Sequence, residues 1–188
     1  MMRGQVVDAA TVDVQGQQET VAWWFLDGLV VEHRVASQMA AVVLEMTLPV
    51  GHSPALHVHE TLDDTWYAIE GRMAARCGDE EFVIEAGDWV SMPRGVAHTF
   101  RVVGDHPARI LTVHDNGSFR DFVRYLGSPA QARTVPDRPR MPAIDELAEV
   151  AARHDIAAIG PPMTVADADE IIERVAHGAR RHRSVDGA

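Results

Sequence analysis

The stretch of sequence that decides the fold is residues 51–71, which read GHSPALHVHETLDDTWYAIEG. His57 and His59 stand at alternate positions in a run of strand-forming residues. Because side chains on a strand alternate between its two faces, both imidazoles are expected on the same side. Asp63 and Asp64 follow closely, so carboxylates join the imidazoles, and both groups bind metal ions in proteins. The stretch therefore predicts half of a metal site carried by a β-strand.

A second stretch, residues 87–100, supplies a third histidine. It reads GDWVSMPRGVAHTF, and its glycines and proline bracket a short strand that leads to His98. Three neutral imidazoles and one carboxylate suit a divalent first-row metal and leave coordination positions open. Open positions favour catalysis, because structural zinc sites are usually closed and tetrahedral. We therefore predict a mononuclear metal centre with four ligands: His57, His59, Asp64 and His98. Iron, manganese, nickel, cobalt and zinc all accept these donors, so the sequence does not select among them.

Around these two stretches the chain reads as a series of short strands. Apolar and β-branched segments alternate with Gly, Pro and Asp turns at the spacing typical of an all-β sandwich or barrel. No helical periodicity interrupts them, so a doubly wound α/β fold is disfavoured. The expected strands span residues 21–26, 29–35, 39–48, 57–59, 65–70, 73–76, 81–85, 89–92, 98–103 and 108–114, with a further short one around residues 5–7.

After residue 118 the pattern changes from strands to helices. Apolar residues spaced three and four apart predict a short helix that Gly127 ends. Thr164, followed by Asp167, resembles the N-cap of a final helix. The expected elements are a helix over residues 119–126, a proline-rich arm over 128–142, a helix over 143–154, an irregular apolar segment over 156–163 and a helix from 165 onward.

These patterns divide the chain into two expected regions. Residues 1–127 are predicted to form a β-barrel with its N-terminal strands. Residues 128–188 are predicted to form a proline-rich arm and a helical C-terminal extension that packs on the barrel.

The composition restricts the classes of function. The net charge of -11 argues against nucleic acid or an anionic membrane as a partner, because such surfaces select basic patches. All 17 basic residues are arginine, so Schiff-base catalysis by lysine is excluded. Cys77 is the single cysteine, which excludes an intrachain disulfide, and its apolar-alternating surroundings predict a half-buried, unreactive thiol. The N-terminal segment lacks the apolar run of a signal peptide, so a cytoplasmic location is expected.

Strand alternation also predicts the wall of a pocket beside the metal. An apolar wall around a metal is the usual composition of a small-molecule site, and Trp66 is placed to stack on an aromatic substrate. Asp63 falls on the opposite face from its neighbour and is interpreted as a solvated turn residue. The predicted substrate-pocket residues are Trp66, Ala68, Phe100 and His114.

The two stretches together resemble the two sequence motifs of the cupin family. The first motif, G-x5-H-x-H-x4-(acid)-x6-G, is matched by Gly51, His57, His59, Asp64 and Gly71. The second motif, G-x5-P-x-G-x2-H, is matched by Gly87, Pro93, Gly95 and His98. The resemblance implies a cupin fold, which is a double-stranded β-helix or jelly-roll barrel. The family usually has Glu where this chain has Asp64, a side chain one methylene shorter.

The wider stretch over residues 23–162 resembles the bacterial quercetin 2,3-dioxygenase-like single-cupin proteins. This resemblance implies a metal-dependent dioxygenase acting on an aromatic or enolic small molecule, with dioxygen as the second substrate. In such a reaction the metal acidifies a bound hydroxyl, and Asp64 is the catalytic residue expected to receive its proton. Cupin barrels are often homodimers, and an exposed N-terminal strand carrying Trp23, Trp24 and Phe25 would need covering.

Two other classes of function stay open for this sequence. One is a non-oxidative metal-dependent cupin, which would be an isomerase, a cyclase or a decarboxylase-type tailoring enzyme. The other is a non-catalytic cupin that binds a small ligand. A single barrel hosts many chemistries, so the motifs favour a fold and a metal more strongly than a substrate.

Overall fold

The computed structural model describes residues 20–33 and 41–183, with side chains described as far as residue 177. The strand expected around residues 5–7 lies outside these ranges. The ends of two other expected strands, at residues 34–35 and 39–40, lie outside them as well.

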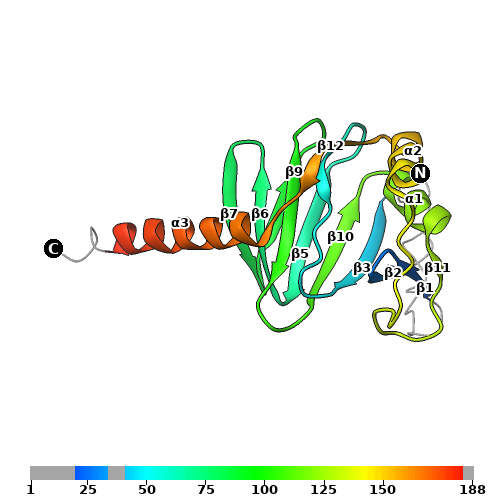
Figure 1. Ribbon diagram of the computed structural model, residues 1–188, viewed down its shortest axis with the longest axis horizontal. Coiled ribbons are helices and arrows are strands. Elements are labelled where there is room, and N and C mark those ends of the chain that lie inside the picture. The colour runs from blue at the N-terminus through cyan, green and yellow to red at the C-terminus, as the bar shows by residue number, and fades with distance from the viewer. Residues whose placement is uncertain (1–19, 34–40, 184–188) are drawn as a thin grey trace, which may run out of the picture.

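Two antiparallel sheets form the body of the protein, as Figure 1 shows. The larger sheet contains, in spatial order, β11 (Ser128–Pro129), β1 (Val21–Phe25), β2 (Gly28–His33), β3 (Val42–Leu48), β10 (Ala108–His114), β5 (Asp64–Glu70) and β8 (Trp89–Met92). The smaller sheet contains β12 (Ile156–Pro162), β4 (Ala55–His59), β9 (His98–Val103), β6 (Arg72–Cys77) and β7 (Glu80–Glu85). The expected all-β class is confirmed.

The inner faces of the two sheets share one apolar core. Alternate residues of β3, β5 and β10 are buried, as expected for strands with one face on the core. Trp66 from the larger sheet meets Phe100 from the smaller one with ring centroids 4.9 Å apart, edge to face. This contact joins the two sheets across the core.

Gly71 shows why the first motif ends in glycine. It joins β5 to β6 with a φ of +83°, in the left-handed region that favours glycine. A Cβ atom at this position would lie 2.6 Å from Cα of Ala108 on β10. The close approach of the two backbones therefore requires a residue without a side chain.

Three helices accompany the sheets: α1 (Ser118–Leu126), α2 (Ile144–Arg153) and α3 (Val165–Arg183). In α1, Phe122 packs edge to face on Phe25 of β1 with ring centroids 5.3 Å apart. At the start of α3, Thr164 Oγ1 accepts a hydrogen bond from the Asp167 amide, and Asp167 accepts one from the Thr164 amide. This reciprocal capping box confirms the predicted N-cap. No helix in the described part of the chain has the length and apolar character needed to span a membrane.

The packing of α3 shows how the C-terminal extension meets the barrel. Ala168 and Ile171 pack on Ala74, whose side chain lies on the outer face of β6. Arg174 pairs with Glu81 of β7 at 3.0 Å. Beyond this pair the helix runs past edge strand β7, as the red ribbon in Figure 1 shows.

The expectation of an irregular segment over residues 156–163 is wrong. Residues 156–162 form β12, which pairs antiparallel with β4, so that Ile156 lies opposite His59 and Ala158 opposite His57. β12 can contain Pro161 and Pro162 because it is the edge strand of its sheet, and an edge strand tolerates residues without an N–H. The C-terminal region therefore adds a strand beside the histidine-bearing strand.

The edge of β1 is covered within the same chain. Ser128 and Pro129 of β11 pair with Trp24 and Trp23, and the indole N–H of Trp24 donates to the carbonyl of Thr134 at 2.8 Å. The proline-rich arm of the same chain thus covers this edge, and the expected homodimer stays a prediction.

Candidate metal centre

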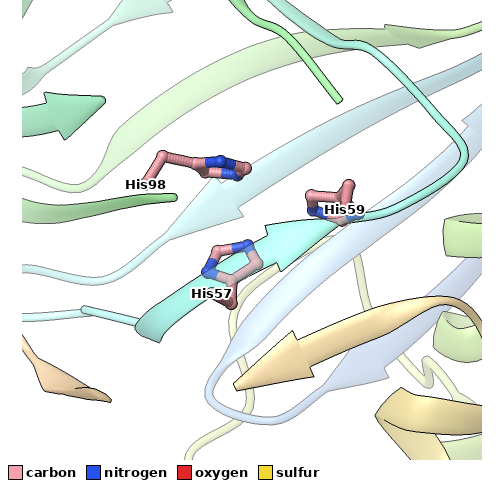
Figure 2. A group of neighbouring side chains, drawn as sticks. All are labelled: His57, His59 and His98. Carbon is pink, nitrogen blue, oxygen red and sulfur yellow. The ribbon is translucent and has the colours of Figure 1, made fainter. Parts of the chain in front are cut away.

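Three histidines from two neighbouring strands meet inside the barrel, as Figure 2 shows. His57 and His59 lie on β4, and His57 is the direct cross-strand partner of His98 on β9. Each residue offers one ligand atom, and these atoms all lie within 4.8 Å of one another. The ring centroids are 4.3 Å apart for His57 and His98, 5.0 Å for His57 and His59, and 5.3 Å for His59 and His98.

Backbone carbonyls fix the tautomers of two of these rings. His57 Nδ1 donates to the carbonyl of Ala55 at 2.8 Å, and His98 Nδ1 donates to the carbonyl of Val96 at 3.0 Å, since a carbonyl oxygen can only accept. The proton on Nδ1 leaves a lone pair on Nε2 of each neutral ring. His98 Nε2 is buried without a hydrogen-bond partner among the described residues. A lone pair in that situation is what a metal ligand needs.

The surroundings keep two of the imidazoles, those of His57 and His59, uncharged at neutral pH. Burial, with a contribution from His98, lowers the pKa of His57 to about 4. Burial lowers the pKa of His59 to about 3 against the attraction of Asp64. Metal ions bind the deprotonated imidazole, so no proton has to leave at neutral pH. The three histidines are therefore positioned to hold a metal ion.

Asp64 lies beside the cluster at the start of β5. Its Oδ1 accepts hydrogen bonds from Trp66 Nε1 at 2.5 Å and from His114 Nε2 at 2.8 Å. Its Oδ2 lies 3.8 Å from Nε2 of His59. Burial alone would raise the pKa of this carboxyl, but the hydrogen bond from His114 and the nearby histidines lower the pKa to about 2. Asp64 is thus ionised at neutral pH, and its part as fourth ligand stays a prediction.

The predicted pocket residues are all buried in the described structure. The exposed fraction is 4% for Trp66, 1% for Ala68, 5% for Phe100 and 1% for His114. Trp66 and His114 meet at the Asp64 carboxylate, whereas Phe100 lies against the Trp66 ring. Their part in binding a substrate stays a prediction.

Phe119, at the start of α1, is a site residue that the sequence did not reveal. Its ring lies edge to face with those of His59 and His114, at centroid distances of 6.0 and 5.2 Å. The helical pattern placed Phe119 on an apolar face, but only the position of α1 against the sheets brings it to the histidines.

Arg94, within the second motif, ties the loops around the cluster together. Its backbone N–H and its guanidinium donate to Asp63, and the guanidinium also donates to the carbonyl of Thr61 and to Asp115. This pairing lowers the pKa of Asp63 to about 2. Asp63 is half exposed, as expected of a turn residue, but it also connects the two motifs.

Cys77 lies next to the cluster without joining it. It is the cross-strand partner of His98 on β6, yet it is not one of the three grouped ligands. Burial raises the pKa of its thiol, which keeps the thiol protonated at neutral pH. This agrees with the expected half-buried, unreactive cysteine.

The fold and the site define a β-barrel protein with a histidine centre suited to a metal ion. Residues 44–114 match the model of the cupin domain family. This part of the chain is therefore similar to the cupin domain family, as the two motifs implied.

Known proteins resemble parts of the chain. Over 92 residues it is 34% identical to a quercetin 2,3-dioxygenase of Aspergillus japonicus, covering 44% of this chain and 26% of that enzyme. Over 67 residues it is 33% identical to an uncharacterized protein of Methanocaldococcus jannaschii, covering 36% of this chain and 54% of that protein. A crystal structure of a cupin 2 conserved barrel domain protein from Rhodopseudomonas palustris is 20% identical, covering 73% of this chain and 79% of that one, with a TM-score of 0.44. The chain thus spans about half or less of the length of these two sequence relatives.

Proposed function

We propose that the protein is a metal-dependent dioxygenase that acts on an aromatic or enolic small molecule. The observation that carries the proposal is the convergence of three imidazoles, whose ligand atoms lie within 4.8 Å of one another, next to a buried carboxylate. The similarity to a quercetin 2,3-dioxygenase supports the reaction class.

Four side chains of this chain would hold the metal. His57, His59 and His98 supply imidazole nitrogens, and Oδ2 of Asp64 is the nearest carboxylate oxygen to them. When bound, a divalent metal supplies Lewis-acid and redox chemistry to a coordinated substrate. Any of the metals iron, manganese, nickel, cobalt and zinc fits this donor set.

The other residues act on the substrate and on water. Oδ2 of Asp64 lies 3.8 Å from His59 Nε2, so it would accept the proton of a hydroxyl held at the histidines. The rings of Trp66 and Phe100 pack edge to face, and the ring of Phe119 on α1 packs edge to face on His59. These aromatic rings exclude water and offer faces and edges on which an aromatic substrate can pack.

The test is an oxygen-uptake measurement with metal-reconstituted protein and a panel of flavonols and other enolic or catechol-type compounds. We expect consumption of substrate and dioxygen together under air, and no turnover without air. The His57→Ala variant is the control, because it lacks one of the three imidazoles.

Two outcomes would replace the proposal. Turnover without oxygen uptake would identify a non-oxidative cupin such as an isomerase, a cyclase or a decarboxylase. A protein that is purified without metal and binds small ligands unchanged in the presence of chelators would identify a non-catalytic binding protein.

A further inference from the structure

We propose that His114 and Trp66 are positioning residues that hold Oδ1 of Asp64, so that Oδ2 is the oxygen presented to the three histidines. The inference rests on the metal centre of the proposed function and assigns a separate task to two residues outside the histidine cluster.

Both hydrogen bonds to Asp64 converge on a single oxygen. Trp66 Nε1 lies 2.5 Å from Oδ1, and His114 Nε2 lies 2.8 Å from the same atom. The other oxygen, Oδ2, lies 3.8 Å from His59 Nε2. One oxygen is therefore anchored, while the other faces the cluster.

The two donors are themselves held rigidly. Asp64 and Trp66 occupy alternate positions of β5 and so point to the same face. His114 ends β10, which pairs with β5 along its length. The Trp66 and His114 side chains are buried, and the His114 ring is backed by Phe119 at 5.2 Å. Neither donor can leave the carboxylate without a change in the packing of the barrel.

The chemistry of the donors fixes the direction of both bonds. An indole N–H can only donate, and an ionised carboxylate can only accept, so His114 Nε2 carries the second proton. His114 Nδ1 is buried without a partner among the described residues, so no competing acceptor turns the ring away. The pair of donors is thus directed at Oδ1 alone.

Such an anchor matters because the last torsion of an aspartate is soft. The terminal sp³–sp² torsion has broad minima, so an unanchored carboxylate would exchange its two oxygens or turn both toward the cluster. With Oδ1 held by two donors, only Oδ2 is available, and the carboxylate acts through one oxygen. This explains how the short aspartate side chain keeps a defined direction toward the histidines.

The test is a titration of metal-free protein with Co²⁺. Calorimetry measures the affinity, and visible absorption reports on the coordination of the bound ion. We expect His114→Leu and Trp66→Phe to weaken Co²⁺ binding about 10–100-fold, the range for partners that orient a metal ligand. Both variants should also change the visible spectrum. His114→Gln should restore affinity and spectrum, because its amide nitrogen can donate from near the position of Nε2.

A matched control separates positioning from general damage to the core. Thr112→Val changes another buried side chain on the same face of β10 without touching Asp64, so its Co²⁺ affinity should equal that of the unchanged protein. Should His114→Leu fail to fold, as judged by near-ultraviolet circular dichroism, Trp66→Phe tests the same oxygen independently.

A double substitution decides whether His114 acts through Asp64. In an Asp64→Ala background, His114→Leu should cause no further loss of affinity, because the group that it orients is already gone. An equal loss in both backgrounds, or no loss in either, would overturn the positioning role while leaving the metal centre intact. If the unchanged protein binds no Co²⁺, the metal centre itself is overturned.

Discussion

His57 and His98 face each other across β4 and β9, with ring centroids 4.3 Å apart, although 40 intervening residues separate them in the sequence. Each ring donates its Nδ1 proton to a carbonyl two residues earlier in its own segment, Ala55 for one and Val96 for the other. The same local hydrogen bond thus orients both rings and leaves the Nε2 atom of each with a lone pair. Strand pairing then brings the two freed atoms together.

Removing either ring should remove the metal. We expect His57→Ala and His98→Ala to lose most of the bound metal, measured as metal per chain by elemental analysis of purified protein. His106→Ala is the matched control, since its side chain is 82% exposed and lies in a distant turn. Full metal content in both site variants would contradict the proposed ligand set.

The metal-free protein should lose stability on mild acidification. The folded-state pKa values of about 4 for His57 and about 3 for His59 lie below the ordinary value of 6.5. As the pH falls below 6.5, these two histidines therefore bind protons in the unfolded chain before they do so in the folded protein. The free energy of unfolding should decrease by at most about 1.4 kcal/mol per pH unit for each histidine. Asp64, with its pKa of about 2, adds a similar loss only below its ordinary value of 3.8.

Urea denaturation at pH 7, 6 and 5 in the presence of a chelator measures this effect. The His57→Ala variant should show a smaller dependence on pH, because one of the two shifted groups is missing. Equal free energies of unfolding at pH 7 and pH 5 for the unchanged protein would show that the buried imidazoles do not resist protonation.

Gly71 provides a test of the packing that supports the motif. We expect Gly71→Ala to lower the free energy of unfolding by more than the about 1–3 kcal/mol typical of a strained backbone alone, because its Cβ would clash with Ala108. Gly104→Ala is the matched control, since its φ is +89° and a Cβ would meet nothing within 4 Å. Chemical denaturation of both variants separates the effect of the clash from that of backbone strain. Equal decreases in the free energy of unfolding would exclude the clash.

The part of the site that the sequence predicts is the part that local rules determine. Strand alternation is enough to place His57 and His59 on one face, and the spacing of the second motif identifies His98. The same rule correctly placed Trp66 and Phe100 in the interior. These predictions need only the period of a strand and the positions of turns.

The contacts that the sequence did not predict depend on tertiary register. The hydrogen bond between His114 and Asp64 joins residues 50 positions apart and requires the pairing of β10 with β5. Phe119 reaches the site only because α1 packs against β1. β12 was missed because its prolines argue against a strand unless the segment is known to lie at an edge.

The last prediction concerns Arg94, which bonds to the loop between His59 and Asp64. Its guanidinium bonds Asp63, Asp115 and the carbonyl of Thr61, and the next amide, that of Gly95, donates to the carbonyl of His59 at 2.8 Å. Arg94→Ala removes the side-chain bonds at an exposed position, so the cooperative unfolding transition should change little. The loops should nevertheless open more often, because local opening depends on the local bonds.

Hydrogen–deuterium exchange read by mass spectrometry tests this prediction. We expect faster exchange in peptides covering residues 59–64 and 93–96, and unchanged exchange in β6 and β7. Arg72→Ala is the matched control, because Arg72 forms an exposed ion pair with Glu85 at 3.0 Å, away from these loops. If both variants exchange alike over residues 59–64, Arg94 does not hold the loops, and the rigidity around the histidines then comes from strand pairing alone.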